Sequence, residues 1–266
     1  MRRIQQSGLP FYQFDHLARD TGVRHGVFTR EGGVSRPPFD SLNVAHGIGD
    51  VPAHVQSNRD RIQTAVGGGR TMAWMHQVHG CRIHRVRTAS DTGVPSADAL
   101  ITTETGLLLA VQVADCQPVL LYDPRHRAVG CVHSGWRGSI VNILGKTVAE
   151  MTRQFGCRPV DILAGIGPSL GPCCAEFRHY RSEIPRNFWS YRNSHNYFDF
   201  WAVSTDQLRR AGVLRKNIEV QGICTRCHSD HYFSYRAAKT TGRLAAVIGL
   251  APDGADTRSS QPARPA

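Results

Sequence analysis

Three side chains that can bind a soft or borderline metal ion stand at the edges of apolar runs in the middle of the chain. They are His79, Cys116 and His133. Two imidazoles and one thiolate are a suitable ligand set for zinc with one coordination position left open. The spacings of 37 and 17 residues are too wide for a local zinc knuckle, so separate strands or loops have to bring the ligands together. A site assembled in that way is usually catalytic.

Other cysteines offer competing interpretations. Cys224-Thr-Arg-Cys-His228 matches the attachment pattern of c-type haem, but attachment occurs on exported chains, and no export signal is visible. Together with His231, the same residues have the spacing of a second zinc knuckle. We expect Cys224, Cys227 and His228 to be dispensable for metal binding, because one zinc ion needs no second site, and we interpret the adjacent Cys173 and Cys174 as packed thiols.

The pattern of histidines and cysteines excludes two classes of metalloenzyme. A blue-copper oxidase requires His-x-His pairs, and none of the 13 histidines lie two residues apart. Zinc deaminases of the cytidine type carry His-x-Glu and Pro-Cys-x-x-Cys, which this sequence lacks.

Composition is that of an ordinary globular chain. With 266 residues, 41% of them hydrophobic and 20% charged, it can bury the core of one large domain, which we expect to cover residues 1–250. No apolar run is long enough to span a bilayer, and the N-terminus lacks the apolar segment of a signal peptide, so we expect a cytoplasmic protein with reduced thiols. The net charge of +11 suits an anionic substrate such as phosphate; no nucleic-acid module accompanies it.

The elements around the candidate ligands are mostly strands. Apolar spacing predicts helices at residues 51–66, 140–155 and 202–211. Apolar runs predict strands at residues 71–75, 82–86, 106–114, 119–122, 128–132, 161–166, 218–223 and 244–250. A further short strand begins at Val23 and runs into a turn, whereas residues 1–20 indicate a strand only weakly. Residues 251–266, rich in Pro, Ser and Asp, are predicted to be a disordered tail.

A glycine-rich turn follows the strand that begins at Val23. Arg30 precedes Gly32 and Gly33, so a guanidinium and free backbone donors could face one anion there. A plain surface turn is the alternative.

The chain also carries motifs in an order that resembles the YfiH-like family, whose members are variously described as laccase-domain, polyphenol oxidoreductase or purine nucleoside phosphorylase proteins. The matching motifs extend over about residues 25–245. They are Phe28-Thr-Arg-Glu-Gly-Gly-Val-Ser35, Ser41-Leu-Asn43, Asn58-Arg59, Gln77-Val-His-Gly80, Ala97-Asp-Ala-Leu100, Ala114-Asp-Cys116, His133-Ser-Gly-Trp-Arg-Gly138, Gly167-Pro-Ser-Leu-Gly171, Cys224-Thr225, Phe233-Ser-Tyr-Arg236 and Thr241-Gly-Arg243.

This resemblance implies an α+β fold, a single-domain α/β/β/α layered sandwich with mixed sheets. It implies one zinc ion bound by His79, Cys116 and His133. It also implies phosphorolysis of purine nucleosides (adenosine, inosine, guanosine and S-methyl-5'-thioadenosine) with inorganic phosphate, together with adenosine deamination. The sequence departs from the family pattern at Ser134, at Ala175 and at Cys227-His228.

Roles for the polar residues in these motifs are expectations. Arg30 and Arg59 are candidates for binding phosphate or substrate, with surface ion pairs as the alternative, and Arg137 either contacts the ligand or braces its loop. Gln77 and Asn43 are candidate polar groups of the pocket. Asp115 either orients a metal ligand or caps nearby backbone.

Two rival functions stay open. Thiolate and imidazole ligands accept copper readily, so a copper-dependent polyphenol oxidase is one rival, and copper can replace zinc at the same ligands in vitro. Some bacterial members of the family are linked to peptidoglycan precursor fidelity, so a peptidoglycan-editing factor is the other. The sequence does not indicate an oligomeric state.

Overall fold

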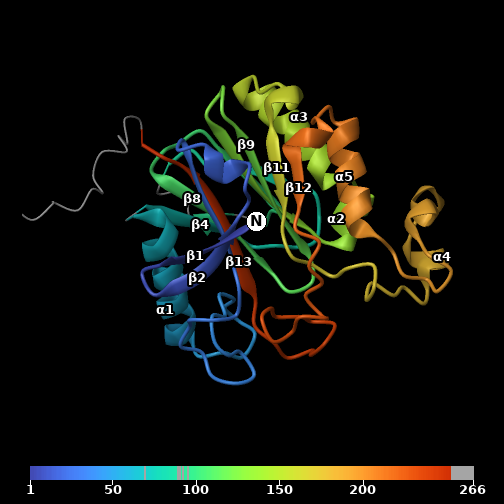
Figure 1. The fold of residues 1–266 in the computed structure, drawn as a ribbon, viewed down its shortest axis with the longest axis horizontal. Coiled ribbons are helices and arrows are strands. Elements are labelled where there is room, and N and C mark those ends of the chain that lie inside the picture. Colours follow the sequence, from blue (N-terminus) through green and yellow to red (C-terminus); the bar gives the residue numbers. More distant parts are fainter. Residues whose placement is uncertain (69, 89–90, 92, 95, 253–266) are drawn as a thin grey trace, which may run out of the picture.

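Two mixed β-sheets packed face to face form the centre of the molecule (Figure 1). The computed structural model describes residues 1–252 except 69, 89–90, 92 and 95. The seven-stranded sheet has the order β1 (Arg2–Gln6), β2 (Leu9–Gln13), β3 (Val23–Phe28), β13 (Leu244–Leu250), β8 (Leu107–Val113), β4 (Thr71–Met75), β6 (Gly93–Val94). The six-stranded sheet has the order β12 (Ile218–Val220), β11 (Leu163–Ile166), β9 (Gln117–Asp123), β10 (Ala128–Ser134), β7 (Ala99–Thr102), β5 (Ile83–Arg85).

The central strands are buried on both faces, which explains their continuous apolar runs. Every residue of β9, β10 and β13 is buried. One core lies between the sheets, where Leu109 of β8 and Ile248 of β13 pack in the same cluster as Leu120 of β9 and Val129 of β10. The opposite faces of the same strands need helices to cover them.

Helix α1 (Pro52–Ile62) and the π-helical turn Gln63–Gly67 cover the seven-stranded sheet. Pro52 suits the first turn because its missing N–H has no intrahelical acceptor there. Ile62 and Val66 pack against Leu108 of β8 and Val247 of β13. This helix and its end agree with the prediction for residues 51–66.

The six-stranded sheet is covered by α3 (Ile143–Phe155) and α5 (Phe200–Arg210), which lie together on its outer side (Figure 1). The helix predicted at residues 140–155 is in fact two, because Asn142 adopts a left-handed conformation that separates α3 from the short α2 (Trp136–Ile140). The Asn142 side chain accepts a hydrogen bond from the Gly145 N–H, which caps α3.

The layer order is therefore helix, sheet, sheet, helix, and the predicted α/β/β/α sandwich with mixed sheets is confirmed. Other details differ from the sequence-based expectations: β12 ends at Val220 rather than at residue 223, β6 and β7 were not predicted, and the weakly indicated N-terminal strand is a hairpin of β1 and β2. Of the predicted tail at 251–266, residues 253–266 lie outside the described part of the chain. Among the described residues, no helix has the length and apolar character needed to cross a bilayer.

One buried histidine links this fold to pH. His25 of β3 is 1% exposed, and its Nε2 accepts a hydrogen bond from the Phe14 N–H at 2.9 Å. Burial, reinforced by the nearby His16, lowers the pKa of His25 to about 3. The folded protein therefore holds this ring neutral where an unfolded chain would protonate it.

We predict that His25 makes the protein less stable as the pH falls from about 6.5 toward 3. In this range the unfolded state binds a proton that the folded state does not, so the free energy of unfolding decreases by at most about 1.4 kcal/mol per pH unit. The His25→Gln variant should show a flatter pH dependence, measured by urea unfolding at pH 7 and pH 4.5. The variant of an exposed histidine, His195→Gln, should keep the wild-type slope. Equal slopes in all three proteins would contradict the prediction.

Candidate active site

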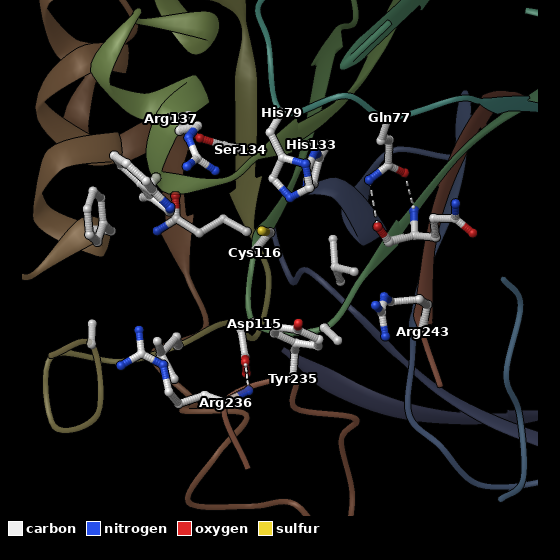
Figure 2. Close-up of a pocket in the computed structure, with 18 of the residues that line it drawn as sticks. Gln77, His79, Asp115, Cys116, His133, Ser134, Arg137, Tyr235, Arg236 and Arg243 are labelled. Atoms are coloured by element: carbon white, nitrogen blue, oxygen red, sulfur yellow. Dashed lines mark hydrogen bonds between the residues drawn. The ribbon is translucent and has the colours of Figure 1, made fainter. Parts of the chain in front are cut away.

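The three candidate metal ligands meet at one end of the two sheets. Strand β8 of one sheet ends at Val113 and β9 of the other begins at Gln117, so Cys116 lies on the short segment that crosses between the sheets. Strand β10 runs antiparallel to β9 and carries His133 at this same end, opposite Pro118. His79 lies in the loop that follows β4 (Figure 2). The ligand atoms of all three residues lie within 4.8 Å of one another.

A buried carboxylate orients two of these ligands. Asp98, just before β7, is fully buried, and its Oδ1 lies 2.8 Å from Nδ1 of His133. The same carboxylate accepts hydrogen bonds from the backbone N–H groups of His79 at 2.9 Å and Gly80 at 2.7 Å. With Nδ1 of His133 held by Asp98, its Nε2 is left for a metal ion. The contacts to the His79 loop hold that residue in a left-handed conformation, with φ of 59°.

The ionisation of the site favours metal binding. Burial by itself disfavours the Cys116 thiolate, but the imidazoles of His133 and His79 lower the pKa of this thiol below its ordinary value. Burial likewise opposes a charged His133, whereas the Cys116 thiolate and Asp98 raise the pKa of its ring. A thiolate is the form of cysteine that binds metal, and a bound ion displaces the imidazole proton.

The geometry fits a tetrahedral ion such as zinc. Zinc–nitrogen bonds of about 2.0 to 2.1 Å and zinc–sulfur bonds of about 2.3 Å place neighbouring ligand atoms about 3.3 to 3.6 Å apart. Ligand atoms already within 4.8 Å of one another reach that arrangement by small side-chain rotations. Gly135 leaves the necessary room, because a Cβ there would lie 3.1 Å from Sγ of Cys116 and 3.1 Å from the ring of His79.

The ligands open into a cavity of about 750 Å³, a size common for small-molecule sites. Aromatic side chains line part of it: Trp136, Phe177, Phe200 and Tyr235. Four cations line it as well: Arg137, Arg236, Lys239 and Arg243. Figure 2 shows Arg137, Arg236 and Arg243 on different sides of the space in front of Cys116. The cavity therefore combines flat apolar surfaces with several positive charges beside the metal ligands.

Asp115 connects the segment that carries Cys116 to the segment that contains Thr225 and Arg236. Its carboxylate accepts hydrogen bonds from Oγ1 of Thr225 at 2.7 Å and from the backbone N–H of Arg236 at 2.6 Å. Of the two roles considered for Asp115, its contacts fit that of capping nearby backbone. The carboxylate that orients a metal ligand is that of Asp98. Like His79, Asp115 has a positive φ, here 82°. One candidate ligand, His79, and the residue before another, Asp115, thus have left-handed backbone, as is frequent at functional sites.

Two of the other residues expected at the site do line the cavity. Gln77 uses both ends of its amide on the backbone of Gln112: Nε2 donates to the carbonyl at 2.7 Å and Oε1 accepts from the N–H at 2.9 Å (Figure 2). Its amide therefore braces the His79 loop against β8. Arg137 lies exposed at the cavity, over the ring of Trp136 at 4.4 Å.

The remaining expected residues are not among those that line this cavity. Arg30 donates to the carbonyls of Asp40 and Ser229, both at 2.7 Å, and pairs with the Asp40 carboxylate at 3.0 Å. Arg59 donates to the carbonyl of Val44 and lies over the Trp74 ring at 4.0 Å.

Asn43 reaches the cavity indirectly. Its Oδ1 accepts a hydrogen bond from the backbone N–H of Arg243 at 2.9 Å, so it positions an arginine that does line the cavity.

Sequence reasoning assigned no role to Asp98, Tyr235 or Arg243. All three stood within motifs of the family pattern, and this was the only signal for them in the sequence. Tyr235 and Arg243 line the cavity together with residues that lie more than a hundred positions away in the chain, such as Cys116.

Comparisons with known proteins agree with this architecture. Residues 24–251 match the family described as multi-copper polyphenol oxidoreductase laccase. A protein of Escherichia coli named purine nucleoside phosphorylase YfiH is 34% identical over 237 residues, which cover 86% of this chain and 94% of the relative. A purine nucleoside phosphorylase of Xylella fastidiosa is 34% identical over 233 residues, or 82% of this chain and 88% of the relative.

A solved structure shows the same fold. The crystal structure of YlmD from Geobacillus stearothermophilus superposes with a TM-score of 0.82 at 32% identity, covering 91% of this chain and 99% of that one. The match to the family spans most of the chain, and the similarity to its relatives extends over nearly their whole length. The chain therefore belongs to the multi-copper polyphenol oxidoreductase laccase family, which confirms its resemblance to YfiH-like proteins.

Proposed function

We propose that this protein is a zinc-dependent purine nucleoside phosphorylase. The observation that carries the proposal is the His79, Cys116 and His133 triad opening into a cavity that holds both aromatic rings and arginines. The names of the relatives support the same class of reaction. The expected substrates are adenosine, inosine, guanosine and S-methyl-5'-thioadenosine, with inorganic phosphate as the attacking group. Adenosine deamination is proposed as a second activity of the same site.

Phosphorolysis demands a clamp for phosphate. Attack of phosphate on the N-glycosidic bond develops positive charge on the sugar and negative charge on the leaving base. Arginine side chains bind phosphate through several charge-assisted hydrogen bonds. Arg243 is the strongest candidate, because it lines the cavity and is only partly exposed, and partial burial strengthens the interaction of a guanidinium with an anion. Arg137 and Arg236 add positive charge to the same cavity.

The nucleoside needs flat apolar surfaces. Tyr235 and Phe177 offer ring faces or edges to a purine, and Tyr235 is 45% exposed within the cavity lining. Arg236 lies 6.0 Å from the Phe177 ring and Arg243 lies 5.7 Å from the Tyr235 ring, which places cations beside the surface on which a base would pack. This arrangement holds a nucleoside and an anion side by side, which lowers the entropic barrier of a reaction between them.

The metal-ligand residues have a separate task. A bound zinc ion acts as a Lewis acid and lowers the pKa of water to about 7, which suits both leaving-group activation and hydrolytic deamination. Asp98 keeps His133 in one tautomer and fixes the His79 loop, so that the ligand atoms stay directed at one point. The thiolate and imidazole set also accepts copper, and a copper-dependent oxidase is the rival activity.

The first experiment compares products with and without phosphate. The purified protein is incubated with adenosine, and the products are separated by chromatography. We expect adenine and ribose 1-phosphate only when phosphate is present, and some inosine in both samples. Absence of phosphate-dependent base release, together with oxidation of phenols by copper-loaded protein, would favour the oxidase.

We next predict that Asp98→Asn weakens zinc binding by about 10- to 100-fold, because the amide has no negative charge and only one acceptor oxygen, and so cannot satisfy both His133 and the N–H groups of His79 and Gly80. Cys116→Ala should abolish binding at this triad. Zinc affinity is measured by competition with a chromophoric chelator.

Asp115→Asn is the matched control for Asp98→Asn. It also replaces a carboxylate beside the ligands, but one that is bonded to Thr225 and Arg236. It should keep wild-type affinity for zinc. Equal weakening in both variants would indicate a general loss of structure and contradict the assigned role of Asp98.

A third prediction concerns phosphate. Removing one charge-assisted contact costs roughly 1.5 to 3 kcal/mol, so Arg243→Ala or Arg137→Ala should lower phosphate-dependent kcat/KM by about one to two orders of magnitude. Zinc content should be unchanged, and deamination should fall less, because water is the attacking group there. Steady-state kinetics with varied phosphate and saturating inosine measure the effect.

Two comparison variants sharpen this test. Arg186 is an exposed arginine that also lies over a tryptophan, Trp189, but outside the cavity, so Arg186→Ala should retain wild-type kinetics. Arg30→Ala tests the phosphate role expected from the sequence. If Arg30→Ala alone raises KM for phosphate, phosphate binds at the glycine-rich turn and the proposed cavity clamp is wrong.

A further inference from the structure

Four cysteine sulfurs converge at a second place in the molecule, behind one wall of the cavity. They belong to Cys173, Cys174, Cys224 and Cys227, and all four sulfur atoms lie within 4.8 Å of one another. Sγ of Cys227 lies 3.5 Å from the sulfurs of both Cys173 and Cys174. Cys174 and Cys224 are buried, whereas Cys173 and Cys227 are exposed. None of these residues belongs to the His79, Cys116 and His133 triad.

The separation of the sulfurs suits a tetrahedral metal ion. It is too large for a disulfide, whose sulfurs are about 2.05 Å apart. Zinc–sulfur bonds of about 2.3 Å in a tetrahedron place the sulfurs about 3.8 Å apart. Sulfurs that are 3.5 Å apart in two pairs and within 4.8 Å in the others are therefore close to this arrangement.

The backbone around Cys224 has the form of a metal knuckle. Cys224 and Cys227 are separated by two residues, and the chain turns so that the His228 N–H donates to the Cys224 carbonyl at 3.1 Å.

The adjacent pair comes from a turn on the opposite loop. Cys174 N–H donates to the Gly171 carbonyl at 2.9 Å, and this turn presents both thiols to Cys224 and Cys227. The histidines considered from the sequence are not part of the group: Nδ1 of His231 lies 2.9 Å from the Glu31 carboxylate instead. Cys173 and Cys174 take the places expected for His228 and His231 in a knuckle.

We propose that Cys173, Cys174, Cys224 and Cys227 form a second zinc site, with four thiolate ligands and no open position. Four protein ligands are typical of a structural site. This assignment replaces the sequence-based expectation that Cys224 and Cys227 are dispensable for metal binding and that Cys173 and Cys174 are packed thiols.

The position of the four cysteines explains what such an ion would stabilise. It would join the loop of residues 167–176 to the loop that begins at Cys224. Short stretches of backbone pair these loops, such as the Thr225 N–H to the Ser169 carbonyl at 3.1 Å. The first loop contributes Leu170 and Ala175 to the cavity, and its Glu176 carbonyl accepts from Nη1 of Arg236 at 2.9 Å. The ion would thus clamp one wall of the cavity from behind.

Metal analysis of the purified protein tests this assignment independently of any enzymatic activity. We expect two zinc ions per chain in the wild type, and one in each of the variants Cys116→Ala and Cys227→Ser. Cys81→Ser is the matched control, since Cys81 is a partly exposed thiol outside both groups and should leave two ions in place. One zinc per chain in the wild type, lost entirely in Cys116→Ala, would overturn the second site. Iron in place of zinc would overturn the choice of metal.

A second measurement covers the case in which Cys227→Ser does not fold. Cys116→Ala protein reconstituted with cobalt should show intense near-ultraviolet sulfur-to-cobalt charge-transfer absorption, because four thiolates surround the ion. Its thermal midpoint should fall when a strong chelator is added, since the ion binds only the folded state. The free thiols of the wild type are then titrated after denaturation with chelator and without reductant. Eight free thiols per chain agree with the proposal. Six free thiols in a protein that contains no metal at this group would show a disulfide instead.

Discussion

The carboxylate of Asp98 is the contact on which the candidate active site depends. A fully buried carboxylate is costly unless hydrogen bonds satisfy it, and this one faces His133 and the backbone of the His79 loop. Burial alone would favour its neutral form, but hydrogen bonds from His133 and from the N–H of Gly80 lower its pKa below the ordinary value. The same few hydrogen bonds therefore stabilise the buried Asp98 carboxylate and direct the ligand atoms at one point.

The packing of two sheets creates the place where these contacts can form. The chain leaves β8 in one sheet, crosses at residues 114–116 and enters β9 in the other. A segment that crosses between layers cannot pair regularly with either sheet, so its side chains are free to serve a site. Asp115 in turn ties this crossing to Thr225 and Arg236, and through them to the wall that carries the four cysteines. The two candidate metal-binding groups thus stand on neighbouring parts of one connected structure.

The arginines illustrate how little a charge count says about function. The net charge of +11 is compatible with a phosphate substrate, but it does not distinguish one guanidinium from another. Arg30 and Arg59 have backbone carbonyls or a carboxylate as partners and help to hold the chain together. Arg137 of α2, together with Arg236 and Arg243 on the segment between β12 and β13, faces the cavity. Arg236 and Arg243 also donate to backbone carbonyls, but unlike Arg30 and Arg59 they line the cavity. The difference lies in what surrounds each side chain.

The sequence by itself predicted most of the strands, the helices α1, α3 and α5, and the three candidate metal ligands. Continuous apolar runs and helical spacing reflect local burial, so β13 was predicted at its observed bounds. The break in the helix at Asn142 was missed, because a single left-handed residue leaves the apolar spacing intact. Residue type alone made His79, Cys116 and His133 candidate ligands, although only the family resemblance singled them out as a set.

The tertiary structure decided which polar groups meet. Asp98 was selected over Asp115 as the orienting carboxylate, and Cys173 and Cys174 were brought to Cys224 and Cys227 across about fifty residues of chain. No periodicity in the sequence encodes these encounters, because they follow from how the layers pack and where the crossing segments run. Local patterns determine what an element is and which face it buries, whereas the chemistry of a site assembled from distant loops exists only after the sheets have packed.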